Sequence, residues 1–153
     1  YNALEIILNN DNSQLFVSCS GTGEVRVFDT ANGDSVNYFP TGSMPWHMAI
    51  SKDDRYLYTT NRMSNNVVQT DLTNGDSKIF TVDNLIMPHG IALTEDDSKL
   101  LIGSSMGDAV YIVDAQSMIL LHSIFFTDTN MNMDGDMNMN SMHMPTGLAI
   151  VQE

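Results

Sequence analysis

Residues 50–59 read Ile50-Ser51-Lys52-Asp53-Asp54-Arg55-Tyr56-Leu57-Tyr58-Thr59, and two other stretches, residues 8–17 and 93–102, align with them without gaps. An aspartate column (Asp11, Asp53, Asp96) and a leucine column (Leu15, Leu57, Leu100) run through all three copies. The aspartates are 42 and 43 residues apart. Self-similarity at such a period indicates a protein built from repeated supersecondary units.

The similarity continues downstream in each copy, through residues 25–29, 67–71 and 110–114. In the first two copies this part is followed by Asn32-Gly33 and Asn74-Gly75. Asn-Gly predicts a two-residue hairpin turn, which needs positive φ at both central positions. The third copy has Ser117-Met118 instead, so we expect its turn to differ in detail.

Each copy leads through a proline into an apolar stretch, at Pro45, Pro88 and Pro145. Proline cannot donate to a β-ladder and therefore belongs at the first residue of a strand. Frequent turn residues and the lack of helical periodicity favour all-β structure. We expect four strands per copy, with a first strand at 4–8 and, in the middle copy, strands at 48–51, 56–61, 66–71 and 77–82.

The proline, Asp-Asp and Val-x-x-x-Asp patterns together resemble the YVTN β-propeller repeat of YncE-like and surface-layer-associated proteins. The resemblance covers Ala3 to Val151 apart from one insertion, although only Tyr58-Thr59-Thr60-Asn61 comes close to the signature that names the repeat. It implies an all-β β-propeller of about three four-stranded antiparallel blades plus one leading strand, an incomplete ring. The blade units are expected at about 3–45, 46–88 and 89–145, with the innermost strand of a next blade at 146–151.

Propellers usually close with 4 to 8 blades, so three blades leave two uncovered faces. We expect the remaining blades to lie in the same parent chain or in another subunit, and single-chain closure favours the first alternative. Tyr1 follows no Met, and no signal peptide is present, so we expect this chain to be a processed product or a piece of a longer one.

One insertion interrupts the repeat. Ala49 to Ala92 spans 43 residues whereas Ala92 to Ala149 spans 57, and the excess of 14 falls within 130–144. We call residues 130–144 the Met-rich segment. Thioethers select soft ions such as Cu(I), and the segment resembles those of periplasmic copper-handling proteins. Its candidate ligands are Met131, Met133, Met137, Met139, Met142, His143 and Met144. Contact with a partner protein, for which Met is an adaptable residue, and a polar low-complexity loop are the alternatives.

His47 and His89 lie at the entrances of innermost strands, near the expected mouth of the central channel. Met44, Met87 and Met144 each stand directly before a proline of the repeat. We therefore expect these histidines and methionines at one rim, with His47 and His89 as further candidate metal ligands. A scaffold role for both histidines is the alternative. Trp46 is expected to pack at a blade interface, and His122 is given no function.

Composition limits the partners. The 153 residues include 19 acidic and 6 basic ones, and the formal charge of -13 disfavours binding to nucleic acid and to anionic membrane surfaces. Cations and basic surfaces are the natural counterparts. No apolar run is long enough to span a membrane.

Cys19 is the single cysteine, so no intrachain disulfide forms, and we expect it to be a small buried hydrophobic residue. The abundance of Asn, Ser, Thr and Asp indicates a periplasmic or extracellular, cell-surface location.

These observations predict an extracytoplasmic β-propeller scaffold that binds a partner protein or Cu(I). The alternatives are a copper-dependent oxidoreductase of propeller type and a structural cell-surface or assembly subunit. No nucleophile–base–orienter set stands out in the sequence, which favours a role without catalysis. Copper is the one cofactor that the candidate ligands suggest.

Overall fold

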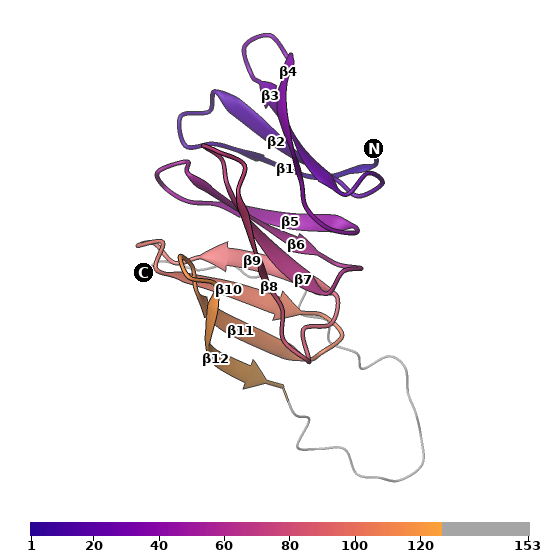
Figure 1. Cartoon of the computed structure of the whole chain (residues 1–153), viewed down its shortest axis with the longest axis vertical. Coiled ribbons are helices and arrows are strands. Elements are labelled where there is room, and N and C mark those ends of the chain that lie inside the picture. Colours follow the sequence, from indigo (N-terminus) through magenta and orange to yellow (C-terminus); the bar gives the residue numbers. More distant parts are fainter. Residues whose placement is uncertain (127–153) are drawn as a thin grey trace.

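The computed structural model describes residues 1–126, which form three four-stranded antiparallel sheets and contain no helix (Figure 1). The predicted all-β fold of stacked blades in an incomplete ring is confirmed. The first blade comprises β1 (Ala3–Leu8), β2 (Gln14–Cys19), β3 (Glu24–Asp29) and β4 (Ser35–Pro40). The second comprises β5 (Pro45–Ile50), β6 (Tyr56–Asn61), β7 (Asn66–Asp71) and β8 (Ser77–Phe80). The third comprises β9 (Pro88–Leu93), β10 (Lys99–Ser104), β11 (Ala109–Asp114) and β12 (Ile119–Phe125).

Strand order follows chain order in every blade, and consecutive blades stack with β1 and β2 against β5 and with β5 and β6 against β9. The expected leading strand at 146–151 and the Met-rich segment lie outside the described residues. Within residues 1–126, no helix is long and apolar enough to cross a bilayer.

The hydrophobic core is divided between the two blade junctions. Successive residues of a strand point to opposite faces, so on β6 Leu57 faces the first blade and Tyr58 faces the third. The first junction buries Phe16, Val25, Val27, Phe39, Met48 and Leu57. The second buries a larger set: Tyr58, Val67, Phe80, Leu85, Ile91, Leu100, Ile102, Ala109, Tyr111, Val113, Ala115 and Met118. Cys19 is buried, as predicted.

The two outer blades carry exposed apolar side chains. On the first blade, Ile6 is 64% exposed and Tyr38 is 57% exposed. Both lie in one cross-strand row with Val17 and Arg26, on the face opposite the core. On the third blade every residue of β12 is exposed. Apolar surface of this kind marks a place where another element packs, which supports the expectation of further blades.

The aspartate column shapes the turn between the first two strands of each blade. Asp11, Asp53 and Asp96 each accept a hydrogen bond from the backbone N–H two residues later, at 2.9–3.0 Å. The residue after each aspartate has positive φ, between 55° and 62°. Hydrogen bonds from Thr94 and Ser98 hold the pKa of Asp96 well below its ordinary value. The carboxylate therefore fixes a tight turn locally.

The same turns link neighbouring blades. The backbone N–H of Asn10 donates to Asp54 Oδ1 at 2.9 Å, and that of Lys52 donates to Asp97 Oδ2 at 2.7 Å. Donors and acceptors occupy equivalent repeat positions. Each junction thus has a backbone-to-carboxylate bond in addition to its buried apolar surface.

The prediction of two-residue Asn-Gly turns was wrong. Only the glycines, Gly33 and Gly75, have positive φ, at 78° and 80°. The turns are longer because an aspartate at the end of the preceding strand accepts bonds from inside them, as Asp29 does from the N–H groups of Ala31 and Gly33. In the third blade Met118 takes the glycine position, with a φ of 59°.

Replacing Leu57, which is fully buried, by alanine should lower the free energy of unfolding by about 3 kcal/mol, because a large cavity opens at the first junction. Ile79→Ala is the control, since Ile79 is 63% exposed and its truncation should cost less than about 0.5 kcal/mol. Urea unfolding of both variants of the full chain measures the difference. Equal losses would show that the junctions do not carry the stability.

Candidate functional site

Two histidines and a tryptophan meet where β5 and β9 begin. The rings of His47 and His89 lie 4.5 Å apart, centroid to centroid, at an interplanar angle of 73°. The Trp46 ring lies 5.3 Å from that of His89. The structure therefore brings together the two histidines that the sequence placed at one rim. Metal binding by them stays a prediction.

His47 stands two residues after Pro45, whereas His89 stands one residue after Pro88. This offset does not separate the two side chains, because both innermost strands are irregular there. The pairing of β5 with β6 shifts register between Pro45 and Met48. The pairing of β9 with β10 shifts near its start as well. A bulge breaks the strict alternation of side chains and re-aims them. Simple period-two reasoning about His47 and His89 fails for this reason.

The hydroxyl of Thr60, on β6, holds the histidine strands together. The backbone N–H of His47 donates to Thr60 Oγ1 at 2.9 Å, and this oxygen lies 3.1 Å and 3.2 Å from the carbonyl oxygens of His47 and His89. Ser18 plays the equivalent part at the first junction. Its hydroxyl accepts a hydrogen bond from the N–H of Glu5 at 3.0 Å and donates one to the carbonyl of Trp46 at 2.9 Å. Sequence reasoning did not single out either hydroxyl, although both occupy one repeat position.

Arg62 also contacts Trp46. Its guanidinium carbon lies 4.9 Å from the centre of a Trp46 ring, a cation–π geometry. Arg62 Nε is buried and has no hydrogen-bond partner among the described residues. Trp46 thus contacts both a cation and an imidazole of the next blade, in agreement with its predicted packing role.

Burial changes the protonation of two side chains on the innermost strands. It lowers the pKa of His47 below the ordinary 6.5, which favours the neutral imidazole that binds metals. It raises the pKa of Glu5, against the opposing effect of the hydrogen bond that its carboxylate accepts from the N–H of Met48. Glu5 occupies the repeat position of His47.

The described residues contain part of the predicted metal site. Met44 and Met87 are half-buried next to Pro45 and Pro88, at the end of the blades where the histidines lie. Residues 1–126 contain no cluster of three or more His, Cys, Asp or Glu side chains that could hold a metal ion. The candidates Met131, Met133, Met137, Met139, Met142, His143 and Met144 lie outside the described residues.

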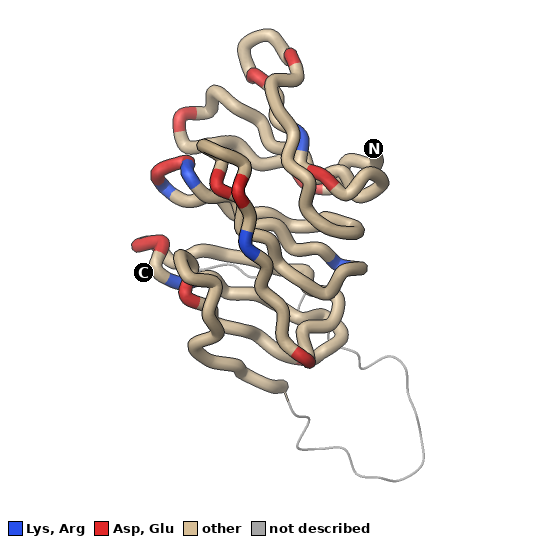
Figure 2. Tube along the Cα trace, viewed as in Figure 1, with Lys and Arg blue, Asp and Glu red and all other residues tan. Residues whose placement is uncertain are grey.

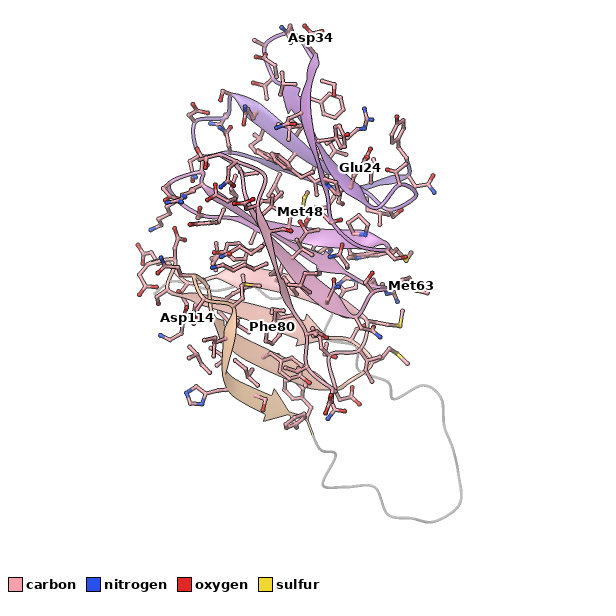
Figure 3. All side chains as sticks on the ribbon, viewed as in Figure 1. Glu24, Asp34, Met48, Met63, Phe80 and Asp114 are labelled. Atoms are coloured by element: carbon pink, nitrogen blue, oxygen red, sulfur yellow. The ribbon has the colours of Figure 1, made fainter. Side chains whose placement is uncertain are left out.

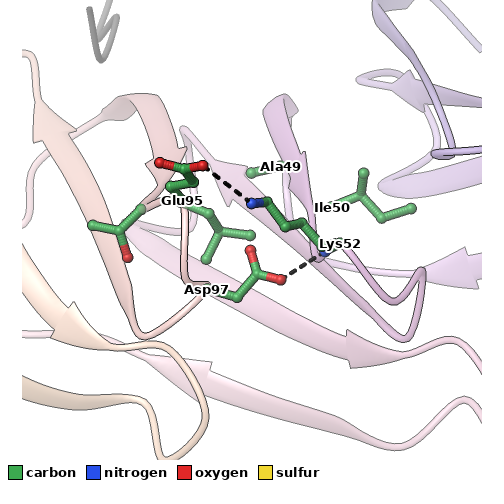
Figure 4. Close-up of a pocket in the computed structure, with 7 residues that line it drawn as sticks. Ala49, Ile50, Lys52, Glu95 and Asp97 are labelled. Carbon is green, nitrogen blue, oxygen red and sulfur yellow. Dashed lines mark hydrogen bonds and ion pairs between the residues drawn. The ribbon is translucent and has the colours of Figure 1, made fainter. Parts of the chain in front are cut away.

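A groove of about 380 Å³ lies at the opposite end of the blades, between the second and third (Figure 4). It is lined by Ala49, Ile50, Lys52, Leu93, Thr94, Glu95 and Asp97. Lys52 links its two sides, with its backbone N–H bonded to Asp97 and its ammonium 3.9 Å from Glu95. These contacts make the groove a part of the blade junction.

Residues 5–118 match the family described as "Lactonase, 7-bladed beta-propeller". The chain belongs to this family. No curated protein matches its sequence. Among solved structures, the chain is similar to hydrazine synthase from Kuenenia stuttgartiensis, with a TM-score of 0.75 and 23% identity over 82% of this chain and 36% of that one.

Two further structures show the same fold. "Structure of U3-55K" matches with a TM-score of 0.73 and 17% identity, covering 82% of this chain and 40% of that one. "Crystal structure of RRP9 WD40 repeats" matches with a TM-score of 0.73 and 18% identity, covering 82% and 39%. The chain therefore spans well under half the length of the solved proteins it resembles. At these identities the likeness shows the β-propeller fold alone.

Thr60→Val should lower the free energy of unfolding by about 1–3 kcal/mol, because it leaves the buried N–H of His47 without its acceptor. Thr59→Val is a matched control: Thr59 is as fully buried as Thr60, but its hydroxyl has no partner among the described residues. That change should be neutral or stabilising. Chemical denaturation compares the two variants, and equal effects would contradict the role given to Thr60.

Proposed function

We propose that this chain is part of a seven-bladed, extracytoplasmic propeller of the YVTN, YncE-like type, a scaffold that binds the soft ion Cu(I) at the histidine-bearing rim. The observation that carries the proposal is the contact between His47 and His89 at 4.5 Å, on the innermost strands of two adjacent blades. Neutral imidazole is a good ligand for copper, and burial favours that form because it lowers the pKa of His47.

The place where the chain leaves β12 supports this proposal. β12 ends beside the β10–β11 turn, where the N–H of Phe126 donates to the carbonyl of Asp108 at 2.8 Å. The equivalent turn of the second blade carries Asn65, which accepts from the N–H of Met87 at 2.9 Å. The chain thus leaves β12 at the end of the blades where Met87 and the histidines lie. A segment of thioethers attached there would complete the coordination of a soft ion.

Cu(I) affinity tests this proposal. In competition with bicinchoninate under reducing conditions, replacing Met131, Met133, Met137 and Met139 by leucine should weaken Cu(I) binding at least about tenfold, since each lost soft ligand is replaced by an inert one. His47→Gln should weaken it too.

His122→Gln is the control, because His122 is an exposed imidazole on β12, away from the rim. Unchanged affinity in both the four-leucine and the His47 variants would refute the proposal. In that case, a protein partner whose binding does not depend on copper would favour the partner-binding alternative.

Hydrolysis of a lactone is a second candidate, favoured by the match of residues 5–118 to the lactonase family. Glu5 is the candidate to take a proton from water, because burial raises the pKa of its carboxyl despite the hydrogen bond from Met48.

If the parent protein hydrolyses a simple lactone such as δ-valerolactone, Glu5→Gln should reduce kcat/KM at least about a hundredfold. The exposed acid Glu95 supplies the control, Glu95→Gln, which should leave the rate unchanged. If the parent protein does not hydrolyse the lactone, or if Glu5→Gln hydrolyses it at the same rate, Glu5 is not a catalytic residue.

A further inference from the structure

Methionine occupies two repeat positions in both the second and the third blade. Met44 and Met87 share the position before the proline, and Met63 and Met106 share a position in the turn between the second and third strands. Met63 is 62% exposed and Met106 is 44% exposed. Figure 3 shows Met63 at one edge of the molecule, with other sulfur atoms along the same edge. Sequence reasoning missed Met63 and Met106, which stand outside the Met-rich segment.

Backbone hydrogen bonds join the loops that carry these methionines. In the second blade the N–H of Arg62 donates to the carbonyl of Met44 at 2.9 Å, and that of Met63 donates to the carbonyl of Ser43 at 3.1 Å. The third blade repeats the arrangement: Ser105 donates to Met87 at 3.4 Å, and Met106 donates to Ile86 at 3.2 Å. The backbone of Met44 therefore lies one residue from a bonded partner of Met63, and the backbone of Met87 lies equally near that of Met106.

The backbone conformation of Met44 and Met87 is unusual for methionine. Their φ angles are 60° and 50°, in the left-handed region that costs a residue with a Cβ about 1–2 kcal/mol. The first blade has Asn2 at this position, with a φ of 54°, and asparagine tolerates that region well.

Burial is less complete at these two sites than at a third methionine with positive φ. Met118 also has positive φ, but its side chain is only 8% exposed and packs in the core. Met44 and Met87 are half-buried at the loop surface. Side chains kept in a costly conformation at the surface point to a function for the side chain itself.

We infer that the pairs Met44/Met63 and Met87/Met106 are thioether sites for a soft monovalent cation, Cu(I) or Ag(I), one site at each paired loop. Thioethers bind such ions in preference to hard cations, and the chain's formal charge of -13 favours a cation. This inference goes beyond the proposed function, because it needs neither His47 nor His89 nor the Met-rich segment. Each can therefore fail without the other.

The test uses the full chain with the segment's six methionines (Met131, Met133, Met137, Met139, Met142, Met144) changed to leucine. Six methionines remain, and their methyl groups, labelled with ¹³C, give six NMR signals during titration with Ag(I). The signals of Met44, Met63, Met87 and Met106 should shift and saturate at about two Ag(I) per chain. Those of Met48 and Met118, buried in the core at 5% and 8% exposure, should not move and serve as internal controls.

Met44→Asn with Met87→Asn copies the first blade, so this double variant should unfold at the same or a higher temperature while Met63 and Met106 no longer respond to Ag(I). Met63→Leu with Met106→Leu tests the partners without touching the left-handed positions and should abolish the shifts of Met44 and Met87.

The inference is overturned if no methyl signal shifts in the six-leucine chain, or if the signals of Met48 and Met118 shift as much as those of the loop methionines. It is also overturned if the two loop methionines left in either double variant still respond to Ag(I). Loss of the fold in the asparagine variant would also overturn it, because methionine would then be structural at these positions. If the original chain binds Ag(I) and the six-leucine chain does not, this inference is wrong and the proposed function is unaffected.

Discussion

Burial of one blade against the next is the interaction on which the rest of this structure depends. A single twisted sheet of four short strands has two apolar faces and no core of its own, so each face must find a neighbour. On β6 the consecutive residues Leu57 and Tyr58 belong to different junctions. The middle blade is accordingly buried on both sides, whereas β12 and the outer face of the first blade are exposed. The family's seven-bladed ring is the arrangement in which every face is covered.

Apolar packing alone would let blades slide, and polar bonds at equivalent positions fix their register. A carboxylate, Asp54 or Asp97, accepts from the preceding blade at one end of the strands. A hydroxyl, Ser18 or Thr60, bonds to the next innermost strand toward the other end. In the third blade Gly103 stands at the hydroxyl position. The two ends also differ in chemistry: many acidic residues lie along one edge in Figure 2, and Met63 lies at the other edge in Figure 3.

Much of this fold could be predicted from the sequence, because the repeat reports strand positions three times over. The expected strands Tyr56–Asn61 and Asn66–Asp71 are found with those bounds. Details that depend on local irregularity could not be predicted. The bulge after Pro45 re-aims His47, and the aspartate-bonded turn makes the Asn-Gly connection longer than two residues. The bond from Thr60 to β9 and the pairing of the Met63 loop with the loop before β5 join segments distant in sequence, so the sequence alone did not predict them.

X-ray absorption at the copper edge, measured on the Cu(I)-loaded parent protein, tests whether soft ligands at the histidine-bearing rim bind Cu(I). If Cu(I) binds there, we expect sulfur scatterers in the first coordination shell, together with the outer-shell pattern of imidazole. A shell of oxygen and nitrogen atoms without sulfur, or a parent protein that retains no Cu(I), would contradict it.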